Sequence, residues 1–304
     1  MNTTTYSAAE TAALLPFPAL VQALEQALLD YAANRINAPE RQVVALPAGG
    51  VMLSMPCTAH DLSIHKLVNV VPSNAATGFP TINGVVSVYE SSTGRTRAIL
   101  DGPTVTARRT AALSMLGIQT LMPGMCPRHA VLIGTGTQAT GHAQALAALY
   151  PGLKVTVVGS RPEKAQAFVK ALHALSLELD LQPGDTVPHD ANVVITLTTS
   201  AHPVYSEPAR SDRLVVGVGA FKPELAEIAP DTLHASQIYV DDLAGARHEA
   251  GDIIQANCSW DSVLPLAHAL EHGTDTLKPR VFKTVGCAAW DLAAARCALL
   301  AKHT

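Results

Sequence analysis

The sequence is poor in aromatic residues, at 4%, and carries no excess of positive charge, since its formal net charge is −4 over 304 residues. Such a balance offers no basic surface for nucleic acid and no polybasic segment for anionic membranes. No uncharged apolar run approaches the roughly 20 residues that span a bilayer, and the N-terminus lacks the regions of a signal peptide. We expect a cytoplasmic protein whose partner is a small molecule.

Paired cysteines and metal-binding histidine spacings are also missing. The five cysteines are far apart and form no C-x-x-C pair, which argues against a disulfide framework and a zinc knuckle. The twelve histidines show no spacing typical of metal ligands. The sequence therefore predicts no metal site.

The chain is long for one core, so its length favours two domains. Residues 1–118 begin with a helical pattern, continue with short β-rich runs that predict an antiparallel sheet, and end in a helix. From residue 129 apolar strands alternate with helices, which is typical of a parallel sheet covered on both faces. We expect an α/β fold with a doubly wound Rossmann domain at 119–290 and an α+β domain at 1–118 and 291–304.

A dinucleotide-binding loop is predicted in "VLIGTGTQATGHAQALAAL", between an apolar strand and a helix. Gly134 permits the tight turn, Gly136 lets the backbone approach a pyrophosphate, and Ala139 allows close helix packing. The N–H groups at the start of the helix suit phosphate oxygens. We also expect three polar residues near the ends of these strands to contact the cofactor: Thr137, Gln138 and Thr198.

The next strand, "KVTVVGSR", bears on the choice of cofactor. NAD sites usually end this strand in an acid that binds the ribose 2′-hydroxyl, but Ser160 and Arg161 stand here instead. A guanidinium suits the 2′-phosphate of NADP, which a carboxylate would repel. The sequence favours NADP(H) and leaves NAD(H) possible, because Arg161 is also explained as the start of a helix.

Three cations in the first domain lie within or beside apolar sequence: Arg41, Lys66 and Arg109. A buried cation requires an anionic partner. Each of the three, taken singly, is better explained by an ordinary surface charge or a structural ion pair.

The strings "KLVNVVPSN", "TARRTAA", "GTGTQA", "EAGDI" and "VFKTVGCAAWDLAAA" together resemble the ornithine cyclodeaminase/μ-crystallin family over nearly the whole chain. The resemblance implies a nicotinamide cofactor, a substrate domain that forms a homodimer through its sheet, and an active site between the domains. It also implies roles for residues at matching positions. Arg41, Lys66 and Arg109 would bind the substrate carboxylate, with Lys66 near the reacting nitrogen and Lys66 and Arg109 catalytic. Thr81 would line the pocket, and the loop of Thr284, Val285 and Gly286 would lie near the nicotinamide.

The stretch "LVVGVGAFKPELAEI" departs from the family pattern. In ornithine cyclodeaminases the corresponding stretch resembles G-A-D-x-P-G-x-x-E-L, and its Asp acts on the amino group. Phe221 occupies the position of that Asp in this chain. A phenyl ring moves no protons, so we interpret Phe221 as a wall of the substrate pocket. The alternative is that Glu224 or Glu227 replaces the missing acid.

The favoured function is NAD(P)H-dependent reduction of a cyclic imino acid, of the pyrroline-2-carboxylate or piperideine-2-carboxylate type. One alternative is ornithine cyclodeaminase, which would form proline and ammonia with bound NAD. A second is a non-catalytic protein that binds small molecules with NADP. The sequence leaves open which imino or amino acid is the substrate, and in which direction the reaction runs in the cell.

Overall fold

The computed structural model describes residues 3–47 and 49–301. It divides into two compact units, Met1–Ala112 with Cys287–Thr304 and Leu113–Gly286, which we describe separately as unit 1 and unit 2. The predicted domain limits, after residues 118 and 290, lie slightly further along the chain. The first limit between the units falls inside helix α3 (Gly102–Leu121), where no turn residues mark it. Residues 1–2, 48 and 302–304 of the predicted α+β domain lie outside the described residues.

Unit 1 contains a 7-stranded sheet in the order β1-β7-β6-β5-β4-β2, with β3 also paired to β4. Every pairing is antiparallel except that of β1 with β7, so the predicted antiparallel sheet is present. Gly94 has the positive φ, 70°, expected of the turn before β7. The strands are β1 (Thr4–Thr5), β2 (Ile36–Asn37), β3 (Gln42–Ala45), β4 (Val51–Ala59), β5 (Leu62–Val70), β6 (Ile82–Glu90) and β7 (Thr96–Asp101). A 3₁₀ turn, η1 (Pro72–Ala76), precedes β6.

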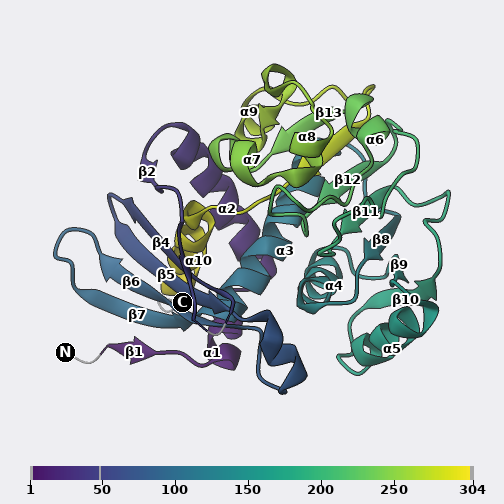
Figure 1. Ribbon diagram of the computed structural model, residues 1–304. Coiled ribbons are helices and arrows are strands. Elements are labelled where there is room, and N and C mark those ends of the chain that lie inside the picture. The colour runs from purple at the N-terminus through teal and green to yellow at the C-terminus, as the bar shows by residue number, and fades with distance from the viewer. Residues whose placement is uncertain (1–2, 48, 302–304) are drawn as a thin grey trace. The chain divides into compact units, whose positions relative to one another are not determined.

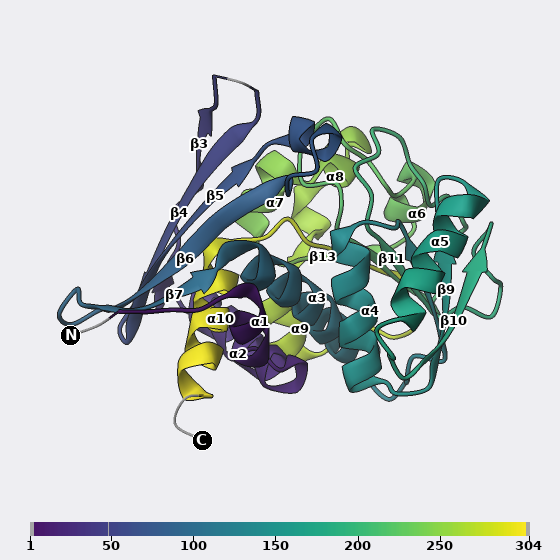
Figure 2. The ribbon, with the colours of Figure 1, turned by 90° about the horizontal axis from the view of Figure 1, so that it is seen from below.

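One face of this sheet is covered by α1 (Ala8–Ala13), α2 (Phe17–Ala32) and the C-terminal helix α10 (Ala288–Leu300) (Figure 2). Helix α10 packs against α2, β4 and β5. Its sequence, AAWDLAAARCALL, suggested an amphipathic helix, but nearly every residue is buried, including Trp290. The alanines explain the difference, because their small side chains let other elements approach the helix from several sides.

Unit 2 is built on an 8-stranded sheet, all parallel, in the order β10-β9-β8-β11-β12-β15-β13-β14. The chain order reverses between β8 and β11, so the predicted doubly wound sheet is confirmed, and the loops that follow these two strands meet at the switch point. The strands are β8 (His129–Ile133), β9 (Leu153–Val158), β10 (Leu179–Gly184), β11 (Val193–Thr196), β12 (Leu214–Gly217), β13 (Gln237–Val240), β14 (Leu264–Pro265) and β15 (Arg280–Lys283).

Helices cover both faces of the parallel sheet, with α4 and α5 on one side and α6, α7 and α8 on the other (Figure 1). Valines and isoleucines of the strands, such as Val215 and Val281, form one core with residues of the second group of helices, such as Ile253. No helix in the described part of the chain is both long and apolar enough to cross a membrane. The helices are α4 (Thr137–Leu149), α5 (Pro162–His173), α6 (Pro230–His234), α7 (Leu243–Glu249), α8 (Gly251–Gln255), α9 (Leu266–His272) and the 3₁₀ turn η2 (Trp260–Ser262).

Arg296 of α10 joins three elements of unit 1. Its guanidinium donates to both carboxylate oxygens of Asp61, in the turn between β4 and β5, at 2.9 and 2.8 Å, and to Asp30 of α2 at 2.8 Å. Burial opposes ionisation of both acids, but the hydrogen bonds that they accept, those from Arg296 among them, bring the pKa of each below its ordinary value. The folded state favours the ionised form of both acids. Their contribution to the stability of the fold is therefore complete near neutral pH and is lost as pH falls below about 4.

We predict that Arg296→Gln lowers the free energy of unfolding by about 1 to 2 kcal/mol at pH 7, since Asp61 is partly exposed, and by less at pH 3.5. Urea unfolding at both pH values measures this. Arg35→Gln is the matched control, because Arg35 also pairs with Asp30 but is 57% exposed. An equal loss in both variants would contradict the assigned role of Arg296.

Candidate active-site residues

Lys66 lies on the buried face of β5, where Ile64 and Val68 also point, because side chains alternate along a strand. Only 2% of Lys66 is exposed. Its Nζ donates a hydrogen bond of 2.8 Å to Oδ2 of Asp291. Burial lowers the pKa of Lys66 to about 8; the Asp291 carboxylate opposes the shift, whereas Arg109 and Arg41 add to it.

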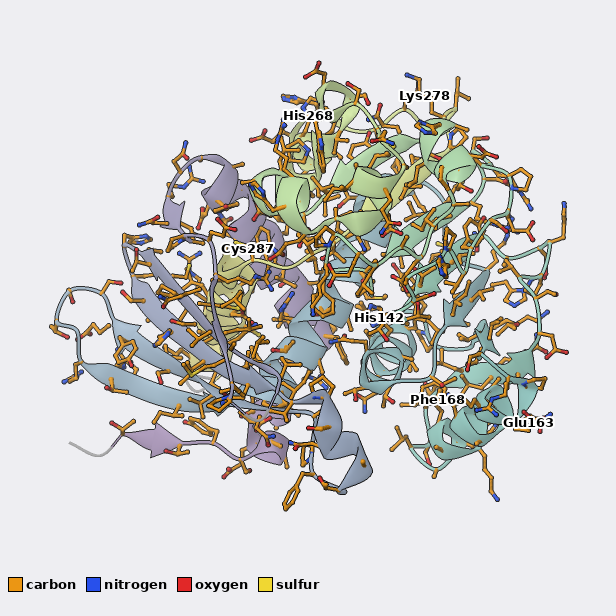
Figure 3. The ribbon with its side chains drawn as sticks, in the orientation of Figure 1. His142, Glu163, Phe168, His268, Lys278 and Cys287 are labelled. Carbon is orange, nitrogen blue, oxygen red and sulfur yellow. The ribbon has the colours of Figure 1, made fainter. Side chains whose placement is uncertain are left out.

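Asp291 is the residue of this group that the sequence analysis did not single out. It is fully buried in the first turn of α10, one turn after Cys287, which is labelled in Figure 3. Its second oxygen, Oδ1, lies 3.4 Å from Nε of Arg109, an ion pair without hydrogen-bond geometry. The signal in the sequence was an acid inside a largely apolar helix, and such an acid requires a partner when it is buried.

The two adjacent arginines of "TARRTAA" face different surroundings. Arg108 donates to the carbonyl oxygen of Leu15 at 2.9 Å and lies 4.0 Å from the ring centre of Phe17, which makes it a structural residue. Arg109 is 6% exposed and faces Asp291. Two neighbouring helical positions point about 100° apart, so only one of them reaches the acid.

Arg41 and Thr81 are the other predicted substrate residues of unit 1. Arg41 precedes β3, is half-buried, and is close enough to Lys66 to affect its pKa. Thr81 is exposed directly before β6, and its carbonyl oxygen accepts from the Val71 N–H. The structure thus places Lys66 and Arg109 against Asp291 and Arg41 near Lys66, whereas the contact described for Thr81 is made by its backbone.

The glycine loop after β8 has the geometry that a dinucleotide requires. Gly134 has φ 129°, and a Cβ there would come within 2.6 Å of the Leu197 carbonyl oxygen. At Gly136, the N-cap of α4, a Cβ would point into open space, so the backbone is accessible from that side. The first α4 N–H to bond within the helix is that of Thr140, which leaves the three preceding N–H groups for phosphates. Ala139 is fully buried, as close packing demands.

His142 supports this loop from within α4 (labelled in Figure 3). Its Nδ1 lies 2.7 Å from the carbonyl oxygen of Gln138, which only accepts, so Nδ1 carries the proton. Burial lowers the pKa of His142 to about 4, so the ring is neutral at pH 7 and its Nε2 accepts from the Ser114 hydroxyl at 2.8 Å. The side-chain Oε1 of Gln138 is buried without a hydrogen-bond partner in the described chain, which suits an additional polar ligand.

Ser160 and Arg161 follow β9, and both are exposed. Arg161 is the N-cap of α5 and accepts the first N–H groups of that helix through its backbone carbonyl. A Cβ at Gly159 would approach the Ala165 nitrogen to 2.9 Å, so a small residue is needed where the chain enters the helix. No acid stands at the end of β9, and the Arg161 side chain stays accessible for an anion.

Asp241, directly after β13, holds the loop that follows β15. Its carboxylate accepts from the Thr284 hydroxyl at 2.8 Å and from the Val285 and Gly286 N–H groups at 2.9 Å each. Gly286 has φ 84°, which favours glycine. Sequence reasoning named the loop but not Asp241, although the acid was visible in "IYVDD".

Glu227 is fully buried, and its carboxylate ties together the loops after β11 and β12. One oxygen accepts from the Thr198 N–H and hydroxyl at 2.6 and 2.8 Å, and the other accepts from the Gly219 and Ala220 N–H groups at 2.6 and 3.0 Å. Burial raises the pKa of Glu227, against the opposing effects of Lys283 and of these donors. Phe221 follows, 37% exposed, and Glu224 is exposed.

A second buried ion pair lies behind this loop. Asp252 accepts the Glu227 and Ile228 N–H groups through Oδ1, and its Oδ2 lies 3.0 Å from the Lys283 Nζ. Asp252 and Lys283 are both almost completely inaccessible. Lys283 ends β15 immediately before the Thr284–Gly286 loop, so one connected set of charges underlies the loops after β11, β12 and β15.

The buried acids Asp291 and Asp252 face lysine and arginine side chains. In residues 3–47 and 49–301 no group of three or more His, Cys, Asp or Glu side chains is placed to hold a metal ion. Asp291 faces Lys66 and Arg109, and Asp252 faces Lys283.

The family model for the ornithine cyclodeaminase/mu-crystallin family matches residues 1–298. The chain belongs to this family. Family membership explains why cations of unit 1 and a nucleotide loop of unit 2 occur in one protein.

Several curated relatives within the family are similar over nearly their whole length. The chain is 56% identical to Delta(1)-pyrroline-2-carboxylate reductase 2 of Burkholderia ambifaria, covering 96% of this chain and 94% of the relative. It is equally identical, with the same coverage, to a Delta(1)-pyrroline-2-carboxylate/Delta(1)-piperideine-2-carboxylate reductase of Azospirillum brasilense. The fold is similar to that of a Thermococcus litoralis Delta(1)-pyrroline-2-carboxylate reductase solved with NADH and L-proline, with TM-score 0.86, 22% identity, and coverage of 99% and 98%.

We predict that Gly136→Thr blocks dinucleotide binding without unfolding the protein. Thr is an acceptable N-cap residue, and its Cβ meets no atom within 4 Å, so only an incoming ligand would clash. We expect at least a tenfold weaker Kd for NADPH, about 1.4 kcal/mol, in fluorescence titration, with an unchanged Tm of the ligand-free protein. Unchanged NADPH affinity in Gly136→Thr would show that the loop is only a turn.

Proposed function

We propose that the protein reduces a cyclic imino acid of the pyrroline-2-carboxylate or piperideine-2-carboxylate type to the cyclic amino acid, with NADPH. The observation that carries the proposal is the loop after β12. Phe221 stands where cyclodeaminases have an acid, and all the described hydrogen bonds of Glu227 hold backbone and the Thr198 hydroxyl. Glu227 is therefore committed to structure and does not replace the missing acid.

A cyclic imine needs no such acid, because its C=N bond is already formed. Arg109 and Arg41 would hold the substrate carboxylate by charge and fix the ring for reaction. Lys66, whose pKa is near 8, is protonated at neutral pH and would give a proton to the imine nitrogen. Phe221 would pack against the flat ring. A bound nicotinamide supplies the hydride for the imine carbon.

The names of the relatives support this substrate class. Those at 55–56% identity are called pyrroline-2-carboxylate reductases, and one name also includes piperideine-2-carboxylate. At this identity over nearly the whole chain, a common reaction is the simplest interpretation. We leave open whether the five- or six-membered ring is preferred.

The preference for NADPH rests on residues of this chain. Ser160 and Arg161 provide a hydroxyl and a guanidinium where NAD-binding proteins commonly carry an acid. The Thermococcus structure contains NADH, so the family as a whole does not decide the matter. The homodimer and the cytoplasmic location remain predictions from the sequence.

To test the function, the purified protein is mixed with NADPH and each cyclic imine, and absorbance at 340 nm is followed. We expect turnover, and formation of proline or pipecolate. Lys66→Met should lower kcat by about 10² to 10⁴, the range of a lost general acid, with little change in the Kd of NADPH. With L-ornithine and NAD the protein should release no ammonia.

Two results would contradict the proposal. Stoichiometric proline and ammonia from ornithine would indicate a cyclodeaminase. Tight NADPH binding without oxidation by any imine of the panel would indicate a non-catalytic binding protein.

We predict that Arg161→Ala weakens NADPH by about 1.5 to 3 kcal/mol, or roughly 10- to 100-fold in Kd, and leaves NADH nearly unchanged, because only NADPH carries the 2′-phosphate. Lys164→Ala removes one positive charge from the same helix and serves as the control. Equal weakening of both cofactors by Arg161→Ala would refute the preference for NADP.

A further inference from the structure

The buried acid of unit 1 stands among groups expected to bind an anion. Asp291 is fully inaccessible and faces Lys66 and Arg109, while Arg41 lies near enough to affect Lys66. A carboxylate here repels the substrate carboxylate and costs free energy to bury. An acid at this position must therefore provide an advantage that outweighs the weaker binding of the substrate carboxylate.

The contacts of Asp291 indicate what that benefit is. Oδ2 accepts from the Lys66 Nζ at 2.8 Å, and Oδ1 meets Arg109 at Nε, 3.4 Å away, on the inner edge of the guanidinium. Nε is the guanidinium atom of Arg109 nearest to this acid. One acid thus faces two cations.

We propose that Asp291 is a positioning residue for the reduction, which keeps Lys66 protonated and aligned as the proton donor and holds Arg109 by its inner edge. This inference rests on the proposed function. Reduction of a C=N bond takes one hydride at carbon, which oxidises NADPH to NADP⁺, and one proton at nitrogen. Lys66 gives that proton and regains one from water.

The charges around Lys66 explain why it needs this acid. Arg109 from α3 and Arg41 before β3 both disfavour its ammonium form, as does burial, and Asp291 from α10 is the acid that opposes them. Cys57 on the neighbouring strand β4 and Cys287 at the start of α10 also lie near Asp291, and burial raises the pKa of Cys57, which stays a neutral thiol. Without the Asp291 charge, Lys66 would lose its proton at a lower pH.

The helix holds the acid firmly in place. Asp291 lies in the first turn of α10, where the N-terminal end of a helix favours a negative charge. Residues around it on the helix, such as Trp290 and Leu292, are fully buried. The carboxylate has little freedom to move away from Lys66.

The test is the pH dependence of kcat/KM for the cyclic imine between pH 6 and 10. In the unmodified enzyme, activity should fall as pH rises through about 8, the pKa of Lys66. In Asp291→Asn this fall should begin at least about one pH unit lower, with about tenfold lower activity at pH 8 and partial recovery at pH 6. The Kd of NADPH should not change.

Asp291→Glu keeps the charge, so its alkaline limb should remain near that of the unmodified enzyme even if kcat falls. Asp61→Asn is the matched control, because Asp61 is an acid of unit 1 that pairs with Arg296 instead, and its limb should not move. Circular dichroism verifies folding, and Asp291→Ser replaces Asp291→Asn if the latter does not fold.

The inference is wrong if the pH at which kcat/KM falls is unchanged in a folded Asp291→Asn or Asp291→Ser variant. It is also wrong if the folded variant loses activity at every pH. Failure of the proposed function is distinguishable, because the unmodified protein would then oxidise no NADPH with any cyclic imine.

Discussion

A charged group without a partner costs several kcal/mol inside a protein, and this chain buries charges in both of its units. In unit 1 the Asp291 carboxylate faces Lys66 and Arg109, and in unit 2 Asp252 faces Lys283 beside Glu227. Each group joins segments that are distant in sequence: β5, α3 and α10 in the first, and the loops around β12 and β15 in the second. The positions of the chemically important side chains depend on satisfying these charges, because none of the acids can turn toward water.

The two groups of buried charges, one around Asp291 and one around Asp252 and Glu227, differ in the contacts that their acids make. Both carboxylate oxygens of Glu227 accept hydrogen bonds from neighbouring donors, so Glu227 shapes the loop that carries Phe221. Asp291 is shared by Lys66 and Arg109, and Arg41 lies close to Lys66.

Much of this could be predicted from the sequence. The parallel sheet followed from strands alternating with helices, and the nucleotide loop from glycine spacing directly after an apolar strand. Lys66 and Arg109 were found because a cation in apolar sequence is unusual. Asp291 and Asp241 were not, since an acid near a helix start or after a strand is common and reveals nothing until its distant partner is known. The sequence analysis did not mark β15, because Arg280 and Lys283 bracket a short strand and their partners, a backbone carbonyl for Arg280 and Asp252 for Lys283, are distant in sequence. Residue 112 gave no sign of a limit between units because α3 runs through it unbroken.

The place of α10 in the chain affects the order in which the protein is made. Most of unit 1 precedes unit 2 in the sequence, but the helix that fills its core, with the acid that neutralises Lys66, is synthesised after unit 2. At about 5 to 20 residues per second, a ribosome needs on the order of ten seconds or more to pass from the end of the N-terminal segment to residue 291. During that interval the sheet of unit 1 lacks α10 on the face that α1 and α2 also cover, and Lys66 lacks its acid, while unit 2 is already complete in sequence. Synthesis of the C-terminal helix is therefore the step that allows the first-made part of the chain to finish folding.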